Sequence, residues 1–250
     1  MKKNRLVIVI KLGSALLTDG KGKINRECIA EVCRQVAYLM RLGHHVLIVT
    51  SGAIASDEHR HRTKNLRAAV GQVKILNIYA QCFANYELEV AQLLLTDEQL
   101  LEGKTAVTQA VISEAFREKV VCIINANDVI DSTEIKALKH CADNDVLTSC
   151  VCQMLGADMA IIAFTEDGVW DNDRRIIREV RQADLARVMA FAKGGNKLGH
   201  GKNGMLTKIK TLGALAAGGT TSILASGKQE NFIVRAFLGE ADFGTKFIAE

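Results

Sequence analysis

The most polar short stretch of the chain is Asp143-Asn144-Asp145, which stands directly before the apolar run 146–155. An Asp at the start of a helix caps free N–H groups and suits the positive end of the helix dipole. For a single acid, capping is the simpler interpretation. Three polar residues in a row exceed what capping needs, so we predict that this stretch contributes to a functional site.

Lysines accompany glycines at two other places. Lys11 stands two residues before Gly13-Ser14, after the apolar run 6–10, and the glycine-rich stretch 194–205 precedes a helix that carries Lys208. Backbone N–H groups that glycine leaves accessible, together with a lysine ammonium, bind phosphate-sized anions. An ordinary turn with a solvated lysine is the alternative for the first stretch, and a flexible linker for the second.

Two further strand ends carry polar residues. As at Gly13-Ser14, an apolar run is followed by small residues at Thr50-Ser51-Gly52-Ala53. Another apolar run is followed by Asn125-Ala126-Asn127-Asp128. The second stretch is equally suited to a turn, because Asn and Asp tolerate left-handed backbone geometry. By contrast, we expect the charged stretch 56–67 to be an exposed loop.

The elements that position these residues follow from hydrophobic periodicity. Short apolar runs predict buried strands, and apolar residues at helical spacing predict helices between them. Alternation of the two favours a parallel sheet with right-handed crossovers, in which ligands bind beyond the carboxyl ends of the strands. The expected strands are 6–10, 45–50, 90–95, 120–124, 159–164, 220–225 and 245–248, and the expected helices are 25–43, 68–86, 97–117 and 146–155.

Composition restricts the class of protein. Of the 250 residues, 48% are hydrophobic and 24% are charged, which is typical of a globular chain. The residues that give the net charge of +4 are scattered along the chain, so neither nucleic acid nor a membrane is an expected partner. The first apolar run is too short for a signal peptide, and we expect a cytoplasmic protein. The seven cysteines are expected to be buried reduced thiols, and no zinc spacing is present.

Taken together, seven stretches resemble, in order and over nearly the whole chain, the glutamate 5-kinases of the amino-acid kinase family. The resemblance implies an α/β fold, a three-layer αβα sandwich with a mainly parallel central sheet. It also implies a single kinase domain over 1–250, with a substrate-binding half at about 1–150 and a nucleotide-binding half at about 151–250. The C-terminal RNA-binding-like domain of some members is not expected. The seven stretches are Ile10-Lys11-Leu12-Gly13-Ser14, Val49-Thr50-Ser51-Gly52-Ala53-Ile54-Ala55, Ala68-Ala69-Val70-Gly71-Gln72, Asn125-Ala126-Asn127-Asp128, Asp143-Asn144-Asp145, Gly204-Met205-Leu206-Thr207-Lys208 and Gly244-Thr245.

The activity that the resemblance implies is ATP-dependent phosphorylation of the L-glutamate side-chain carboxylate. The products are L-glutamyl 5-phosphate and ADP, in the first step of proline biosynthesis. Mg²⁺ is expected to arrive with ATP, without a metal site built by the protein. A homo-oligomer, dimer or tetramer, is expected as well.

Site residues carry over by motif. Lys11, Asp145 and Lys208 would be catalytic, with Asp145 orienting the two lysines that hold the phosphates. The expected ligands of L-glutamate are Ser51, Gly52, Asp128 and Asn144. On the nucleotide side the expected residues are Lys11, Gly13, Ser14, Thr165, Glu166, Gly204, Met205 and Lys208, with Gly13 and Ser14 acting through backbone N–H groups.

Two other hypotheses stay open. Ala126 replaces the Glu of the usual Asn-Glu-Asn-Asp loop, and the stretch between Ala55 and Ala68 is short, which favours a different small carboxylate or amino-acid acceptor. A non-catalytic ligand-binding sensor is the second. The presence of all three residues Lys11, Asp145 and Lys208 argues against a sensor.

Overall fold

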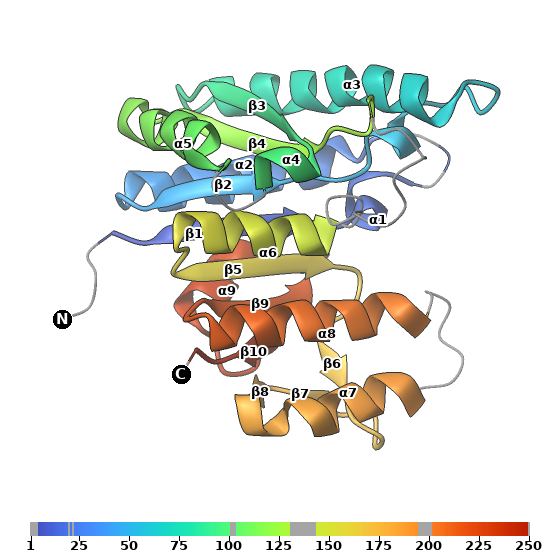
Figure 1. Cartoon of the computed structure of the whole chain (residues 1–250), viewed down its shortest axis with the longest axis vertical. Coiled ribbons are helices and arrows are strands. Elements are labelled where there is room, and N and C mark those ends of the chain that lie inside the picture. The colour runs from blue at the N-terminus through green and yellow to red at the C-terminus, as the bar shows by residue number, and fades with distance from the viewer. Residues whose placement is uncertain are drawn as a thin grey trace.

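The computed structural model describes residues 5–19, 21, 23–100, 104–130, 144–194 and 202–249. Its centre is an eight-stranded sheet in the order β3-β4-β2-β1-β5-β9-β10-β8, and β6 and β7 form a separate hairpin (Figure 1). The strands are β1 (Val7–Leu12), β2 (His45–Val49), β3 (Val90–Leu95), β4 (Val121–Ala126), β5 (Met159–Phe164), β6 (Val169–Trp170), β7 (Ile176–Ile177), β8 (Glu179–Val180), β9 (Thr221–Ser226) and β10 (Thr245–Phe247).

Within the large sheet, every pairing from β3 across to β9 is parallel, whereas β10 runs antiparallel to β9. Strands covered on both faces need apolar residues at consecutive positions, which is why these runs lack the alternation of a half-exposed strand. The strands expected at 90–95 and 159–164 have the bounds predicted, and the others differ by one or two residues at an end.

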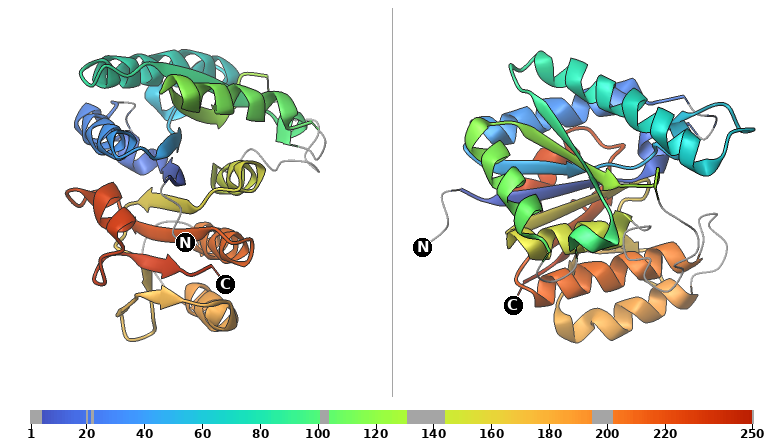
Figure 2. Two further views of the ribbon diagram at one scale, coloured as in Figure 1. Left: turned by 90° about the vertical axis from the view of Figure 1, so that its left-hand side faces the viewer. Right: turned by 45° about the horizontal axis from the view of Figure 1, so that its top comes forward.

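Helices cover both faces of the sheet (Figure 2). One layer contains α2, α3 and α9, and the other contains α5, α6 and α8, so the predicted three-layer αβα sandwich is confirmed. The helices are α1 (Ser14–Leu17), α2 (Arg26–Arg41), α3 (Lys64–Ala84), α4 (Asp97–Leu100), α5 (Ala106–Glu118), α6 (Asn144–Leu155), α7 (Leu185–Gly194), α8 (Lys202–Ala217) and α9 (Phe232–Leu238), with 3-10 turns at Ile54–Ser56 and Gln182–Asp184.

The core lies on both sides of the central strands. In β1, Ile8 and Ile10 pack toward α2, α3 and α9, whereas Val9 packs toward α5 and α6, and all three side chains are fully buried. Each such burial contributes roughly 1.5–3 kcal/mol. The two half-cores therefore fix β1, and with it Lys11, in the middle of the molecule.

Helix boundaries follow local capping. The side chain of Asn25 accepts a hydrogen bond from the N–H of Cys28 and starts α2, and Gly43 follows the helix at φ +89°. Both features agree with the helix predicted over 25–43. The helix predicted from 68 begins earlier, at Lys64, because the Thr63 side chain caps it by accepting from Leu66 N–H.

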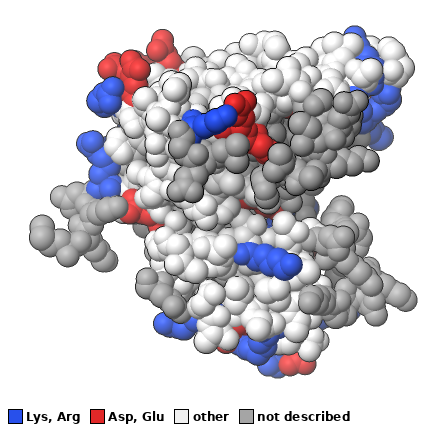
Figure 3. Space-filling view, viewed as in Figure 1, with Lys and Arg blue, Asp and Glu red and all other residues white. Residues whose placement is uncertain are grey.

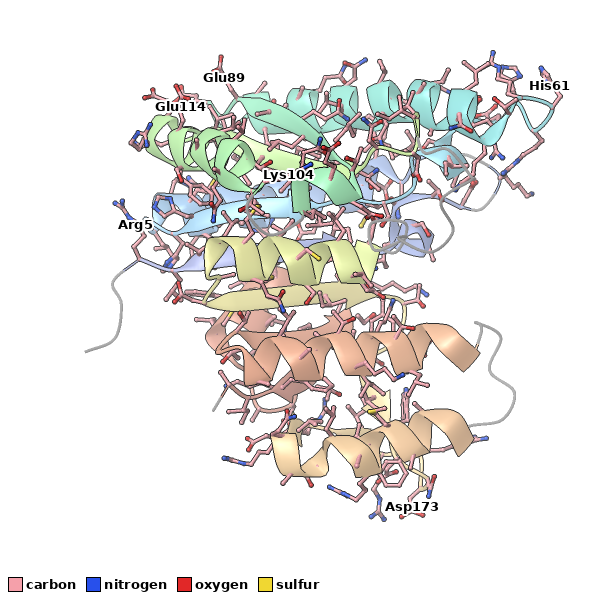
Figure 4. The ribbon with its side chains drawn as sticks, in the orientation of Figure 1. Arg5, His61, Glu89, Lys104, Glu114 and Asp173 are labelled. Atoms are coloured by element: carbon pink, nitrogen blue, oxygen red, sulfur yellow. The ribbon has the colours of Figure 1, made fainter. Side chains whose placement is uncertain are left out.

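The expectation of an exposed loop over 56–67 is wrong at its start. Ser56 and Asp57 are buried, although Arg60 and His61 are exposed, and His61 lies at the outer tip of the loop before α3 (Figure 4). The buried Asp57 is matched by Arg62, whose Nη1 lies 3.2 Å from Asp57 Oδ2. Charge runs are solvated as a rule, but a paired acid can be buried.

Two other boundaries differ from the prediction. The stretch 97–117 holds two helices, α4 and α5, not one. The glycine-rich stretch was expected to be a loop as far as Met205, yet α8 already begins at Lys202. Glycine keeps its backbone N–H, so Gly204 near the helix start weakens α8 only through its larger loss of conformational entropy. In the described part of the chain, we find no helix with the length and apolar character to cross a membrane.

Candidate functional site

A single carboxylate joins two lysines at the carboxyl ends of the strands. Asp145 Oδ1 lies 2.7 Å from Lys11 Nζ, and its Oδ2 lies 2.5 Å from Lys208 Nζ. Lys11 comes from the end of β1, Asp145 from the first turn of α6 and Lys208 from α8. In Figure 1 these ends lie at the right-hand edge of the sheet.

The cluster is largely shielded from water. The exposed fractions of the side chains are 6% for Lys11, 4% for Asp145 and 17% for Lys208. Burial alone would raise the pKa of Asp145, but the charges and hydrogen bonds of Lys11 and Lys208 outweigh it and keep this pKa below its ordinary value. Asp145 is therefore an anion, and the cluster of three carries one net positive charge.

The elements explain this arrangement. Lys11 follows three fully buried apolar residues of β1, which fix its backbone in the middle of the sheet. Asp145 stands where the N-terminal dipole of α6 favours a negative charge. Each ammonium has three N–H donors, and the contact with Asp145 takes one of them.

An amide network lies beside this cluster. The side-chain NH₂ of Asn144 is 2.9 Å from the carbonyl oxygen of Thr50, 2.6 Å from Ser51 Oγ and 3.2 Å from Asn125 Oδ1. Ser51 Oγ accepts in this pairing, so its own hydrogen can point to another acceptor. The network ties the end of β2, the end of β4 and the start of α6 to one another.

Two glycines shape the backbone here. Gly52 has φ +88°, a left-handed conformation that side chains disfavour, and it follows Ser51 directly. The N–H of Gly13 donates to the carbonyl oxygen of Ala163 at 3.0 Å. The prediction that Gly13 offers this N–H to a phosphate therefore does not fit the structure, in which Gly13 instead links β1 to β5.

The remaining predicted residues stand at the same edge without forming part of the lysine cluster. Asp128 lies two residues beyond β4, with its carboxylate 3.9 Å from Lys64 Nζ. Ser14 is exposed at the first residue of α1, and Thr165 and Glu166 follow β5, with Glu166 exposed. Gly204 and Met205 lie in the first turn of α8. Asp143 lies outside the described residues.

Sequence reasoning assigned no role to two polar contributors. Asn125, the buried partner of Asn144, lies inside β4, because that strand extends to Ala126. Tyr79 of α3 is fully buried, and its hydroxyl lies 3.2 Å from Thr50 Oγ1, at the end of β2. A polar residue at the end of an apolar run was a usable signal for Asn125, whereas nothing in the sequence linked Tyr79 to Thr50.

Within the described ranges, no group of three or more His, Cys, Asp or Glu side chains could hold a metal ion. On the face shown in Figure 3, basic and acidic residues are scattered among uncharged ones.

Comparisons with known proteins bear on the family of the chain. The model of the amino acid kinase family matches residues 6–226. A glutamate 5-kinase from Dehalococcoides mccartyi (strain ATCC BAA-2266 / KCTC 15142 / 195) is 37% identical over 257 residues, covering 96% of this chain and 68% of that protein. One from Caldanaerobacter subterraneus subsp. tengcongensis is 33% identical, covering 96% of this chain and 67% of that protein.

Solved structures share the fold. The carbamate kinase from Giardia lamblia bound to AMP-PNP superposes with a TM-score of 0.67 at 19% identity, covering 100% of this chain and 99% of that one. At such identity the likeness shows the architecture alone. The family model, which matches most of the sequence, establishes that the chain belongs to the amino acid kinase family.

Proposed function

We propose that the chain is an ATP-dependent glutamate 5-kinase. It transfers the γ-phosphoryl group of ATP to the side-chain carboxylate of L-glutamate, giving L-glutamyl 5-phosphate and ADP, the first step of proline biosynthesis. Relatives named glutamate 5-kinase support this activity. The observation that carries it is the pair of lysines held by Asp145 at the strand ends.

The residue types suit this reaction. Phosphoryl transfer spreads negative charge over the oxygens of the transferred group, so fixed positive charges and positioning supply most of the catalysis. A carboxylate acceptor with a pKa of about 4.3 is already ionised at neutral pH and needs no general base. Lys11 and Lys208 supply the charge, and Asp145 keeps both ammonium groups in place.

We assign the two substrates to the two halves of the chain. Ser51, Gly52, Asp128 and Asn144 bind L-glutamate in the half at about 1–150, where the Asn144 network leaves the Ser51 hydroxyl free to donate to a carboxylate. The nucleotide side consists of the half at about 151–250 together with the first strand and turn. Its residues are Lys11, Gly13, Ser14, Thr165, Glu166, Gly204, Met205 and Lys208. For Gly13 we propose that the absence of a side chain lets the phosphates pack closely against the backbone.

Mg²⁺ accompanies ATP in this proposal. The ion would neutralise phosphate charge while keeping most of its ligands from phosphate and water. Asp145, the buried carboxylate of the cluster, already uses both oxygens on lysines, so it suits the orientation of those lysines better than metal binding.

We also propose that the chain forms a dimer or tetramer. Strand β3 is at one edge of the sheet, and its six residues Val90–Leu95 carry no charge. Nearby on α3, Val73 is 59% exposed. Uncharged edge strands next to exposed apolar side chains favour association. Light scattering should give a multiple of the 27.2 kDa chain mass, and Val73→Glu should lower it.

A cytoplasmic location is part of the proposal. The six described cysteines are all free, and burial raises the pKa of Cys28 and Cys122 to about 11. Buried thiols of this kind are usual in a reducing compartment.

ADP release from purified protein with Mg-ATP, with and without L-glutamate and with hydroxylamine as a trap, tests the activity. We expect glutamate-dependent ADP with an equal amount of hydroxamate, and no comparable turnover with L-aspartate or glutarate. Greater turnover with another acceptor would transfer the assignment to that compound, as Ala126 would allow. Thermal stabilisation by ATP without turnover would point to a sensor.

A matched pair of variants tests the site. Lys208→Ala should lower kcat by roughly 10²–10³-fold, the loss typical of removing a donor to a charged transition state. Lys210→Ala removes an exposed lysine from the same helix and should leave kcat unchanged. Equal activity of the two variants would remove Lys208 from the mechanism.

A further inference from the structure

A basic hollow of about 440 Å³ lies away from the lysine cluster, between the start of α2, the 3-10 turn Ile54–Ser56 and one face of α3. We name it the basic hollow because Lys23 and Arg26 line it from the α2 side and Lys74 from α3. The two helices are neighbours in the same layer (Figure 2).

These positive charges are poorly matched by negative ones. Among the described residues, the side chains of Lys23 and Arg26 form neither an ion pair nor a hydrogen bond. Glu58 is the acid in the lining, and it is exposed. Two further acids lie close to these cations: Asp57 is shared between Lys74 and Arg62, and Asp19 interacts with the charges of both Lys21 and Lys23. Counted with Lys21 and Arg62, the cations around the hollow still exceed these acids and Glu58 by two, and an anion would balance that excess.

Hydrogen-bond donors and an apolar floor complete the basic hollow. Asn77 and Gln81 lie one turn apart on α3, and no described residue bonds their side-chain amides. Ile24 and the nearly buried Ile78 lie between the polar groups. Cations with amide donors around a small apolar floor fit a compact ligand that carries several anionic oxygens.

The basic hollow also touches the loop that carries Ser51 and Gly52. Lys74 Nζ donates to the carbonyl oxygen of Ser56 at 3.2 Å and lies 3.9 Å from the buried Asp57. Ser56 itself lines the hollow, and its N–H bonds back to the carbonyl of Gly52 at 2.9 Å. An occupant that contacts Lys74 therefore acts on the backbone that leads directly to Ser51.

We infer that the basic hollow is a second ligand site, which binds a small anion with two or more negative charges and holds the 51–58 loop in the conformation of this structure. The ligand is a phosphate or a polycarboxylate, recognised by Lys23, Arg26 and Lys74. Its effect on the kinase reaction rests on the function proposed above, whereas its binding does not.

Calorimetric titration at low salt, with inorganic phosphate in one arm and tricarballylate in the other, measures binding without any need for activity. Lys23→Gln and Arg26→Gln should each weaken binding roughly tenfold, since a hydrogen bond to a charged group contributes an energy of this order. Neither change removes a structural contact. Arg41→Gln, at the exposed far end of the same helix, is the matched control and should bind as the wild type does.

The two arms identify the ligand class. Binding of either anion that depends on Lys23 and Arg26 supports the site and names its chemistry. Binding that is equal in the wild type, Lys23→Gln and Arg26→Gln, or no binding of either anion, overturns it. Asn77→Asp adds a negative charge at an exposed helix position and should abolish the same binding.

Kinetics then test the coupling to the loop. The anion that binds should lower the KM for L-glutamate by roughly fivefold, at the lower end of ordinary coupling between sites. The KM for ATP should not change, and the effect should vanish in Arg26→Gln. If the anion binds but the KM for L-glutamate does not change, the coupling is refuted. If the protein has no kinase activity at all, the proposed function is refuted, but the binding result still stands.

Discussion

Asp145 is the residue on which the electrostatics of the site depend. It stands between Lys11 and Lys208, two cations that would repel each other without it. Its carboxylate offers both oxygens, so each ammonium is fixed in position by an oxygen of its own. An acid in this position organises the positive charge that the reaction uses.

Asp145→Asn should therefore damage both activity and stability. The amide keeps the shape but loses the charge, which leaves the buried Lys11 and the partly buried Lys208 without this anion. We expect turnover to fall by roughly 10²-fold or more, and the free energy of unfolding to fall by about 3 kcal/mol, the lower end for a broken buried pair. Turnover and thermal unfolding are the measurements.

The control for this variant is Asp184→Asn. Asp184 pairs with Arg187 at 2.8 Å on the surface, and such exposed pairs contribute little. It should behave as the wild type in both assays. Wild-type turnover of Asp145→Asn would contradict the role given to the carboxylate.

At the scale of elements, α3 holds the substrate loop in place. Gly71 of α3 packs so closely against the loop that an added Cβ would lie 1.7 Å from the carbonyl oxygen of Ala53. Tyr79, farther along the same helix, contacts Thr50. The position of Ser51 and Gly52 thus depends on a helix that contributes none of the predicted ligands.

Gly71→Ala should displace this loop. We expect the KM for L-glutamate to rise clearly while the KM for ATP stays near its wild-type value, because Ala53 directly follows Ser51 and Gly52, which are assigned to L-glutamate. Gly218→Ala, where a Cβ would meet only ordinary contacts, is the control. A KM for ATP that rises as much as that for L-glutamate would show a general loss of structure instead.

The starts of β1 and β2 provide a pH-dependent contact. Leu6 N–H donates to His44 Nδ1 at 3.3 Å, and burial lowers the pKa of His44 from 6.5. The folded state then disfavours the protonated ring, so the unfolded chain binds more protons between the folded pKa and 6.5. Stability should be complete above pH 6.5 and fall as the pH decreases through the folded pKa.

Denaturant unfolding at several pH values measures this effect. His44→Gln keeps a side-chain acceptor for Leu6 but does not titrate, so its stability should change less between pH 7.5 and 5 than that of the wild type. Parallel pH dependences of the two proteins would mean that His44 does not contribute.

The sequence predicted elements well where the cause is local. Buried parallel strands are continuous apolar runs, so β3 and β5 could be located from their residues alone. The start of α3 was placed too late because the cap, Thr63, lies within a charged stretch. Asp57 was expected in solvent since its partners Arg62 and Lys74 become neighbours only when α3 folds back on the loop.

At the scale of the whole molecule, the site joins residues that are distant in the chain. Lys208 and Asp145 are 63 positions apart, and they meet because α6 packs on β1 while α8 packs on α6 and β9. Periodicity carries no information about which carboxylate meets which lysine, so the placement of Asp145 between the two lysines was expected from the family resemblance alone. The hydrogen bonds of Asn144 to Ser51 and Asn125 could not be predicted from periodicity either, because they join residues that are distant in the sequence.

The absence of proline from all 250 residues has a consequence for folding. Cis–trans isomerisation of X–Pro bonds is the usual source of folding phases of about 10–100 s. Refolding from denaturant should therefore show no phase that a prolyl isomerase accelerates. Stopped-flow fluorescence of Trp170 with and without the isomerase is the measurement, and an isomerase-sensitive phase would contradict the expectation.

The transfer of an oxygen isotope tests the central claim most directly. L-Glutamate labelled with ¹⁸O in its side-chain carboxylate is incubated with protein, Mg-ATP and hydroxylamine, and the phosphate released is analysed by mass spectrometry. Attack of hydroxylamine on the acyl carbon expels phosphate with the bridging oxygen, so phosphoryl transfer to this carboxylate predicts one ¹⁸O atom in each phosphate. Unlabelled phosphate, or ADP formation that does not depend on glutamate, would contradict the account.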